Sequence, residues 1–142
     1  MPLSTLLVRT LRPGEYDRAR RAYEAWGYRG EVLDTDVVFA AEQGDAMVGL
    51  VRRTVENGTQ MLRGMYVAPF IRRSGVGSLL LSHFVDTLQA PACWCVPYAN
   101  LQHFYGRGGF HVAPLAESPP FLRERLDFYR REGLDVILMR RS

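Results

Sequence analysis

Residues 61–89, MLRGMYVAPFIRRSGVGSLLLSHFVDTLQ, predict a strand, a tight turn rich in arginine and glycine, and then a helix. The strand is an apolar run rich in strand-forming residues that closes at Val67. Gly75 and Gly77 permit a sharp turn and leave room for a ligand to approach main-chain N–H groups. We expect the helix to begin at about Ser74 or Gly75, so that its unpaired N–H groups and the positive end of its dipole face the turn. The stretch therefore predicts an anion site, and a pyrophosphate would suit it best.

The expected helix has a polar stripe and a wide apolar face. Ser78, Ser82, Asp86 and Gln89 follow one another at spacings of four, four and three residues. The apolar positions are Val76, Leu79, Leu80, Leu81, Phe84, Val85 and Leu88. A helix that is apolar over so much of its surface is expected to pack on a sheet. The alternative is an ordinary core helix after a flexible turn.

The glycine turn differs from two common phosphate-binding loops. The ATP-binding P-loop requires a lysine, and all 18 basic residues of this chain are arginines. The dinucleotide fingerprint requires a third glycine where this chain has Leu80. What remains is Arg72-x-x-Gly75-x-Gly77. This pattern resembles the coenzyme A signature of the GNAT family of N-acetyltransferases.

A second segment, residues 100–110 (NLQHFYGRGGF), also resembles that family. Tyr105, Gly109 and Phe110 match the family pattern in type and spacing, whereas the family's alanine would fall at His103 or Phe104. Two such segments in the right order are far more specific than either one alone.

The order of expected elements is typical of an α/β (α+β) fold. Strands are expected at residues 6–9, 36–42, 46–55, 59–67, 92–96, 110–112 and 134–140, with a type I′ turn at Asn57-Gly58. Helices are expected at residues 13–26, after the glycine turn, at 101–106 with Asn100 as cap, and from Ser118-Pro119 to Gly133. The resemblance implies one GNAT domain, residues 1–142, with a mixed, mostly antiparallel sheet of six to seven strands and a splayed central pair. The helix before the last strand is an addition to the family pattern.

Composition limits the other classes of function. The chain has 142 residues, is 47% hydrophobic and carries a formal charge of +3, which suits an anionic cofactor. No run is long enough to cross a membrane and no signal peptide is evident, so we expect a cytoplasmic protein. Cys93 and Cys95 are interpreted as reduced, packed residues, and no metal site is expected. A nucleic-acid role for Arg52, Arg53, Arg72 and Arg73 was considered, but no helix carries a basic stripe with base-reading residues.

The resemblance also implies a site for acetyl-CoA between two parting strands. Main-chain groups of Met65, Tyr66 and Val67 would pair with the pantetheine arm, and the N–H of Val67 or of a neighbour would polarise the thioester carbonyl. The pyrophosphate would be held by Arg72, Arg73, Ser74, Gly75, Val76 and Gly77, and Asn100 and Tyr105 complete the expected cofactor contacts. Tyr105 is the candidate acid for the departing thiolate, because a phenol and a thiol have similar pKa values; the alternative is a tyrosine anchored in the core.

The base is less clearly marked. Glu42 ends a strand beside the expected cleft and is the first candidate, while Glu31, Asp34 or Asp36 would act through water or attract a cationic amine. These three acids also suit a solvated connection. Arg63 is the only charged residue of the central strand, which argues against a lysine-acetylating mechanism. His103 is expected on the surface.

We therefore expect an N-acetyltransferase that moves the acetyl group of acetyl-CoA to a primary amine of a small molecule or peptide by direct attack in a ternary complex. The alternative is a non-catalytic module that binds and senses acyl-CoA. Residues 27–36 and the final helix and strand would set the acceptor. A homodimer would pair through the terminal strand, with Val136 and Leu138 on its apolar face.

Overall fold

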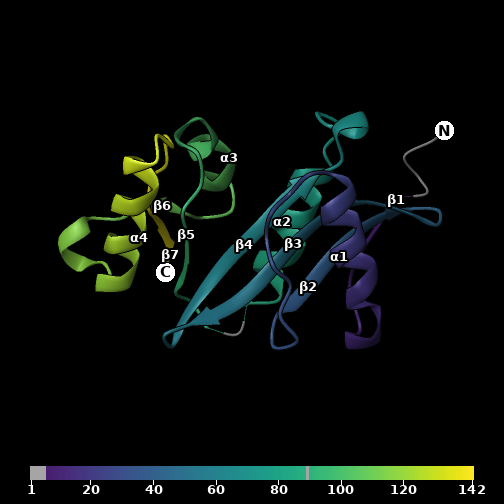
Figure 1. The fold of residues 1–142 in the computed structure, drawn as a ribbon, viewed down its shortest axis with the longest axis horizontal. Helices are drawn as coiled ribbons and strands as arrows, with labels where there is room; N and C mark the ends of the chain where they lie inside the picture. The colour runs from purple at the N-terminus through teal and green to yellow at the C-terminus, as the bar shows by residue number, and fades with distance from the viewer. Residues whose placement is uncertain (1–5, 89) are drawn as a thin grey trace.

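A single mixed sheet runs through the molecule. The computed structural model describes residues 6–88 and 90–142, and in these it contains seven strands in the order β1-β2-β3-β4-β5-β7-β6 (Figure 1). Every neighbouring pair is antiparallel except β4 and β5, which are parallel, as predicted. The strands are β1 (Leu6–Thr10), β2 (Val37–Gln43), β3 (Ala46–Glu56), β4 (Thr59–Val67), β5 (Cys93–Cys95), β6 (His111–Val112) and β7 (Met139–Arg141).

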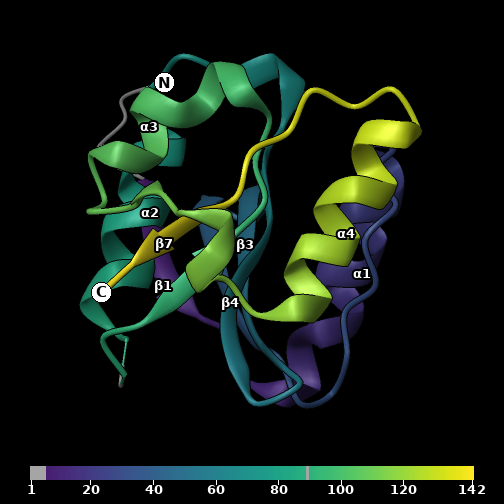
Figure 2. The ribbon, with the colours of Figure 1, turned by 90° about the vertical axis from the view of Figure 1, so that its left-hand side faces the viewer.

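Helices cover both faces of this sheet. Figure 2 shows α2 and α3 on one side of the strands and α1 and α4 on the other. The α-helices are α1 (Tyr16–Ala25), α2 (Val76–Asp86), α3 (Gln102–Gly106) and α4 (Pro120–Arg131), with 3-10 turns at η2 (Pro13–Glu15), η3 (Pro69–Ile71), η4 (Ala99–Leu101) and η5 (Leu115–Glu117). In the part of the chain that the structure describes, no helix has the length and apolar character needed to span a membrane.

Alternation along the strands explains the two layers. In β2, Val38 and Ala40 pack with the tyrosines of α1, while Phe39 and Ala41 pack with α2 on the opposite face. Gly49 lets α2 approach β3 closely, since a Cβ at this position would lie 2.8 Å from Leu80 Cδ1. The apolar face of α2 thus packs on the sheet as predicted, apart from Leu79, which is 49% exposed. Gln89 of the expected polar stripe lies outside the described residues.

The hairpins follow the local sequence signals. Asn57 and Gly58 have φ values of 51° and 73°, the two positive values that a type I′ turn requires. Toward the other end of β4 the register with β3 shifts, so that Gly64 and Met65 together oppose Val51. Gly64 has φ 65°, and a Cβ there would lie 2.6 Å from the Tyr23 hydroxyl. This bulge changes the course of β4 just before its end.

β4 and β5 part soon after they meet. Their ladder pairs only Met61 with Trp94, and the chains then follow separate courses. The sequence-based expectation of a splayed central pair in a mixed sheet is therefore confirmed.

Two expected caps were wrong, and one helix begins a residue later than expected. α2 begins at Val76 with Gly75 as its N-cap. Asn100 lies exposed inside η4 and makes no capping bond, because the chain turns into a 3-10 helix one residue before it. Ser118 does not cap α4, since its hydroxyl donates to Pro114 O (2.8 Å) and the N-cap is Pro119.

The last strand is shorter than expected and lies inside the sheet. β7 pairs with β5 on one side and β6 on the other, so it offers no free edge to a second copy. Val136 and Leu138 are buried against α4 and Trp94. The proposed dimer contact through these two side chains is therefore excluded by their burial.

Candidate functional site

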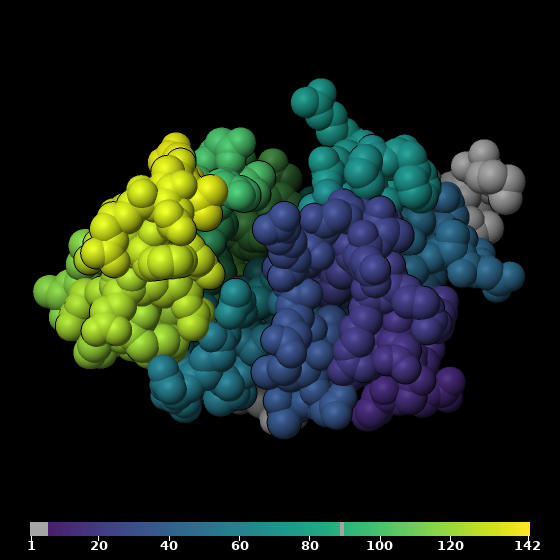
Figure 3. All heavy atoms as spheres, in the orientation of Figure 1, coloured from purple at the N-terminus to yellow at the C-terminus, as the bar shows by residue number. Residues whose placement is uncertain are grey.

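A cavity of about 750 Å³ opens where β4 and β5 separate. Figure 3 shows the surface hollowed between the C-terminal part of the chain, green to yellow, and the teal and blue remainder. Its walls come from β4, the segment after β5, α3, α4 and the loop after α1. They include Tyr28, Gly30, Met61, Leu62, Arg63, Gly64, Met65, Cys95, Val96, Pro97, Tyr98, Leu101, Tyr105, Arg125, Phe128, Tyr129, Glu132, Leu134 and Val136.

Main-chain groups at the end of β4 point away from the neighbouring strand β3. Ala68 N–H donates to Val48 O (2.8 Å), and Val67 lies opposite Gly49. This geometry makes Gly49 and Val67 a non-hydrogen-bonded pair, so that the N–H and C=O of Val67 point away from β3. Tyr66 is the adjacent hydrogen-bonded position and turns its main-chain groups toward β3. The register therefore suits the role expected for Val67 and does not support pairing of the Tyr66 main chain with pantetheine.

The glycine turn leaves the first N–H groups of α2 without side-chain caps. The first intrahelical bond runs from Leu79 N–H to Gly75 O (3.1 Å), and the N-cap makes no side-chain bond. Gly75 has φ 90°, and nothing lies within 4 Å of a Cβ built on it. Gly77 sits where three elements meet, with its Cβ position 3.4 Å from Phe104 and 3.7 Å from Val67. The two sequence motifs are thus brought together at the end of β4.

The two arginines of the turn differ in their surroundings. Arg72 Nε donates to Val67 O (3.0 Å), and the Arg72 guanidinium carbon lies 4.9 Å from the centroid of the Tyr66 ring. Tyr66 in turn stacks on Trp26, with centroids 5.8 Å apart. Arg73 is exposed and has φ 66°, an uncommon conformation for a residue other than glycine. Arg72 is therefore held at the gap by its neighbours, and Arg73 extends into solvent.

Tyr105 lies in the wall of the cavity. Its ring packs edge-on against Phe104 (4.9 Å between centroids) and Phe110 (6.1 Å). Burial raises the pKa of Tyr105, and nearby Cys95 and Tyr28 raise it further. The hydroxyl is therefore protonated at neutral pH, the form in which it can donate a proton.

Comparison with known proteins places this architecture in a family. A model of the acetyltransferase (GNAT) domain matches residues 34–112, more than half of the chain. The chain belongs to the GNAT acetyltransferase family. The match ends before α4, the helix that the sequence marked as an addition to the family pattern. A search of curated proteins found no match.

Solved GNAT structures have the same fold. N-acetylglutamate synthase from Neisseria gonorrhoeae, complexed with coenzyme A and N-acetyl-glutamate, is 17% identical with a TM-score of 0.67, over 96% of this chain and 34% of that one. The present chain thus spans about a third of the length of that synthase. The ribosomal-protein-S18-alanine N-acetyltransferase of Escherichia coli is 18% identical with a TM-score of 0.66, over 95% and 92%. A GNAT acetyltransferase of Streptococcus pneumoniae is 14% identical with a TM-score of 0.69, over 96% and 98%.

Glu42 faces arginines and not the cavity. Its carboxylate accepts from Arg9 Nε of β1 (2.6 Å) and from Arg18 Nη2 of α1 (3.1 Å). The hydrogen bond from Arg9 is the main cause of the lowered pKa of Glu42, which burial opposes and Arg18 supports. A carboxylate held in this way is a poor proton acceptor. Glu42 also does not line the cavity between β4 and β5. The geometry therefore argues against Glu42 as the base.

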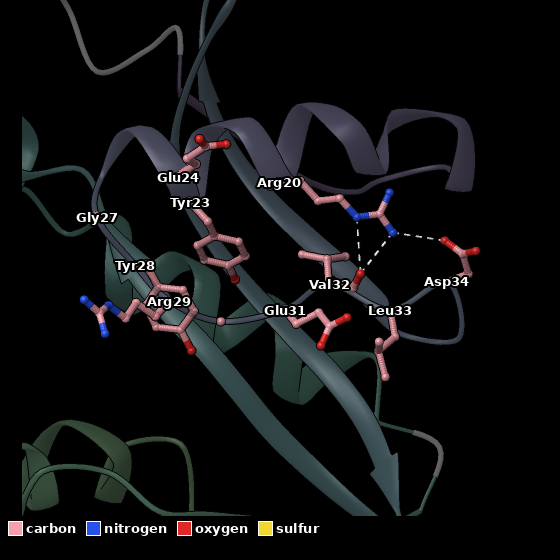
Figure 4. A pocket seen from close by; sticks show the side chains of 11 residues that line it. Arg20, Tyr23, Glu24, Gly27, Tyr28, Arg29, Glu31, Val32, Leu33 and Asp34 are labelled. Carbon is pink, nitrogen blue, oxygen red and sulfur yellow. Dashed lines mark hydrogen bonds and ion pairs between the residues drawn. The ribbon is translucent and has the colours of Figure 1, made fainter.

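The acidic residues after α1 have separate environments. Asp36 is buried and accepts from Arg52 Nη1 (3.0 Å), so it cannot attract an amine from solvent. Asp34 is exposed and pairs with Arg20 (3.0 Å), which also donates to Val32 O (Figure 4). Asp34, Arg20 and Val32 line a second, open hollow of about 850 Å³, together with Glu24 and Glu31.

The remaining expectations concern surface residues. His103 is exposed, as predicted, and Asn100 is exposed as well. The arginines considered for nucleic acid do not form one surface stripe, because Arg52 is buried and Arg53 donates to Thr87 O (2.9 Å) at the end of α2. Burial raises the pKa of Cys93 to about 12, and Cys95 is shifted in the same direction, as suits packed thiols.

The sequence predicted which segments border the acceptor, residues 27–36 and the final helix, but not which of their side chains line the cavity. α4 contributes Arg125, Phe128, Tyr129 and Glu132, and the loop after α1 contributes Tyr28 and Gly30. The pattern of the final helix shows which of its faces is apolar, but it does not show which of its side chains border the cavity.

Proposed function

We propose that this GNAT protein transfers the acetyl group of acetyl-CoA to a primary amine of a small molecule or peptide by direct attack in a ternary complex. The observation that carries the proposal is the separation of β4 and β5, which opens a cavity, with the Val67 N–H directed away from β3 and the uncapped start of α2 near the same end of β4. Acetyl-CoA, when bound, supplies the acetyl thioester.

The residues present fit coenzyme A. The uncapped N–H groups at the start of α2 and the open space at Gly75 suit a pyrophosphate, and Arg72 and Arg73 add positive charge. The Val67 N–H, directed into the gap, would donate to the thioester carbonyl oxygen and withdraw charge from the carbon under attack. Met65, which also lines the cavity, would contact the pantetheine arm.

Tyr105 is proposed as the acid. It lines the cavity and stays protonated, so it can give its proton to the departing thiolate. Its raised pKa makes it a weaker acid than a free phenol, but a thiolate released in the same buried place would have a raised pKa too. The presence of this hydroxyl in the cavity favours an enzyme over a sensor that only binds acyl-CoA.

No side chain is assigned as the base. Glu42 is engaged by two arginines, and Arg63, the charged residue of β4, is a cation. We propose that the amine loses its proton to water. The amine substrate must then be one whose neutral form is accessible near neutral pH.

Calorimetric titration of acetyl-CoA tests the proposed cofactor. We expect micromolar binding by the intact protein and its loss in Gly77→Asp, since a carboxylate in the first turn of α2 repels a phosphate. The same charge favours the start of the helix, but the new Cβ would lie 3.4 Å from Phe104, so a thermal melt of the variant must show that its fold is kept. Gly14→Asp adds an equal charge at a position with no neighbour within 4 Å and should bind normally. Absence of binding by the intact protein would exclude the proposal.

Release of free thiol in the presence of amines tests catalysis. Tyr105→Phe keeps the aromatic ring and should still bind acetyl-CoA, but it should turn over about 10²–10⁴-fold more slowly, the usual contribution of a positioned acid. Full turnover by this variant would remove Tyr105 from the mechanism. Cofactor binding without thiol release from any amine would support the sensing module.

A further inference from the structure

Charged residues in the cavity wall are mostly cationic. Among the described residues, Arg29, Arg63 and Arg125 line it, together with one acid, Glu132. They come from three separate parts of the fold, namely the loop after α1, β4 and α4. A wall of this kind favours an anionic group on the acceptor and disfavours one with additional positive charge.

Two of these arginines are fixed by one carboxylate. Glu56, at the end of β3, accepts from Arg125 Nη2 (2.7 Å) and lies 3.3 Å from Arg63 Nη1. Desolvation of Glu56 opposes ionisation, but hydrogen bonds from Arg125 and Thr54 and the charge of Arg63 still lower its pKa. Glu56 is therefore ionised and holds two guanidinium groups at the same wall, so that part of each donor fork is left unused.

One donor of this pair has no acceptor. In residues 6–88 and 90–142, the structure gives no hydrogen-bond partner for Arg125 Nη1, which is buried. Buried guanidinium N–H groups normally have partners, and leaving one unpaired is unfavourable. Outside this enclosed atom, the Arg63 and Arg125 side chains remain 34% and 23% exposed, so a carboxylate lying between them would accept from their accessible N–H groups.

The outer part of the cavity is apolar. Tyr98 is 53% exposed and Phe128 52% exposed, and Leu101 and Leu134 are also partly open to solvent. Large apolar side chains exposed together at a concave site mark a ligand surface. This rim suits an apolar or aromatic group on the acceptor.

From this wall and rim we propose that the acceptor is a small amine that carries a carboxylate on an apolar body, as an apolar α-amino acid does. Arg63 and Arg125 bind the carboxylate, and Tyr98 and Phe128 contact the apolar part. The proposal rests on the proposed function and specifies the substrate class of the same site. Polyamines and lysine side chains, which bring positive charge and no carboxylate, are excluded by it.

A matched set of amines tests the carboxylate. Thiol release is measured with L-phenylalanine, L-phenylalaninamide and phenethylamine at saturating acetyl-CoA. The amide has the less basic amine and so more of the neutral nucleophile, and a preference for the acid must therefore arise from its carboxylate. We expect kcat/KM for the acid to exceed that for the amide by about 10–100-fold, as for a lost charged hydrogen bond. Equal or better use of the amide or of phenethylamine would overturn the proposal.

Variants identify the residues. Arg63→Gln and Arg125→Gln should raise KM for the acid about tenfold or more and bring the acid-to-amide ratio toward one, with the calorimetric affinity for acetyl-CoA unchanged. Arg131→Gln, on the exposed side of the same helix, is the matched control and should keep the ratio. Unchanged ratios in both cavity variants would refute the assignment of these arginines.

A binding measurement separates this proposal from the proposed function. N-acetyl-L-phenylalanine and N-acetyl-L-phenylalaninamide are titrated into the protein, alone and with coenzyme A. Tighter binding of the acid supports the carboxylate site even if no turnover is found, and equal binding contradicts it. Failure of acetyl-CoA to bind would reject the proposed function by itself.

Discussion

The two halves of the sheet are built in different ways. β1 to β4 form a meander of strands 5 to 11 residues long, joined by short hairpins after β2 and β3. β5, β7 and β6 contain two or three residues each and are separated by loops, α3 and α4. The first half is held by continuous ladders, and the second mainly by side chains packed around α4 and Trp94. The candidate site lies where a half ordered by local pairing meets a half ordered by packing.

The largest expected effect is in the first half. Phe84 of α2 is fully buried and packs edge-on against Phe39, with centroids 5.6 Å apart. Phe84→Ala should lower the free energy of unfolding by about 3–5 kcal/mol, because it leaves a cavity between helix and sheet. Urea unfolding measures the loss. Leu79→Ala, on the exposed side of the same helix, should cost less than about 1 kcal/mol; equal losses would mean that α2 does not anchor this half.

A slightly smaller effect is expected in the second half. Leu122 of α4 is fully buried with Leu126 and Leu138. Leu122→Ala should cost on the order of 3 kcal/mol. If the halves differ as described, amide hydrogen exchange will rise in α4 and β7 while β2 and β3 stay protected. A uniform rise throughout the sheet would show that the two halves unfold as one unit.

The glycine turn between the halves should respond more weakly. Gly75→Ala places a side chain at φ 90° in open space, so only the backbone conformation opposes it. We expect a loss of about 1–2 kcal/mol in urea unfolding. Gly14→Ala, which has neither a positive φ nor a close neighbour, should be nearly neutral. A neutral Gly75→Ala would indicate that the turn does not require the left-handed conformation.

Acid should produce the smallest difference, confined to the first half. Hydrogen bonds from Arg9 and from the Arg12 main chain lower the pKa of Glu15 from 4.5 to about 2. The carboxylate's contribution is thus complete above pH 4.5 and is lost as the pH falls toward 2. Glu15→Gln should melt at a lower temperature than the parent at pH 7, and the gap should narrow by pH 2. A difference in melting temperature that does not change with pH would show that the lowered pKa of Glu15 does not contribute to stability.

A feature could be predicted when residues close together in the sequence determine it, and could not when residues far apart in the sequence do. The Asn57-Gly58 turn and the run from β4 through the glycine turn to α2 follow from neighbouring residues, and the sequence predicted them. The caps at Asn100 and Ser118 failed because adjacent 3-10 turns use the same residues differently. The partners of Glu42 lie 33 and 24 residues away along the chain, and those of Glu56 include Arg125, 69 residues away. No local pattern indicates such pairs, and these pairs decide which acids and cations face the cavity.

The single paired position between β4 and β5 has a mechanical consequence. In residues 6–88 and 90–142, the register between β4 and β5 pairs Met61 with Trp94 alone, so the main chains of the two halves are joined at one point, a pivot. A molecule bound in the gap would contact both halves at a distance from this pair of residues and would oppose rotation about the pivot. Ligand binding is therefore expected to make the whole sheet more rigid. Slower exchange of the few amides at this pivot would report occupancy of the gap with no assay of the chemistry.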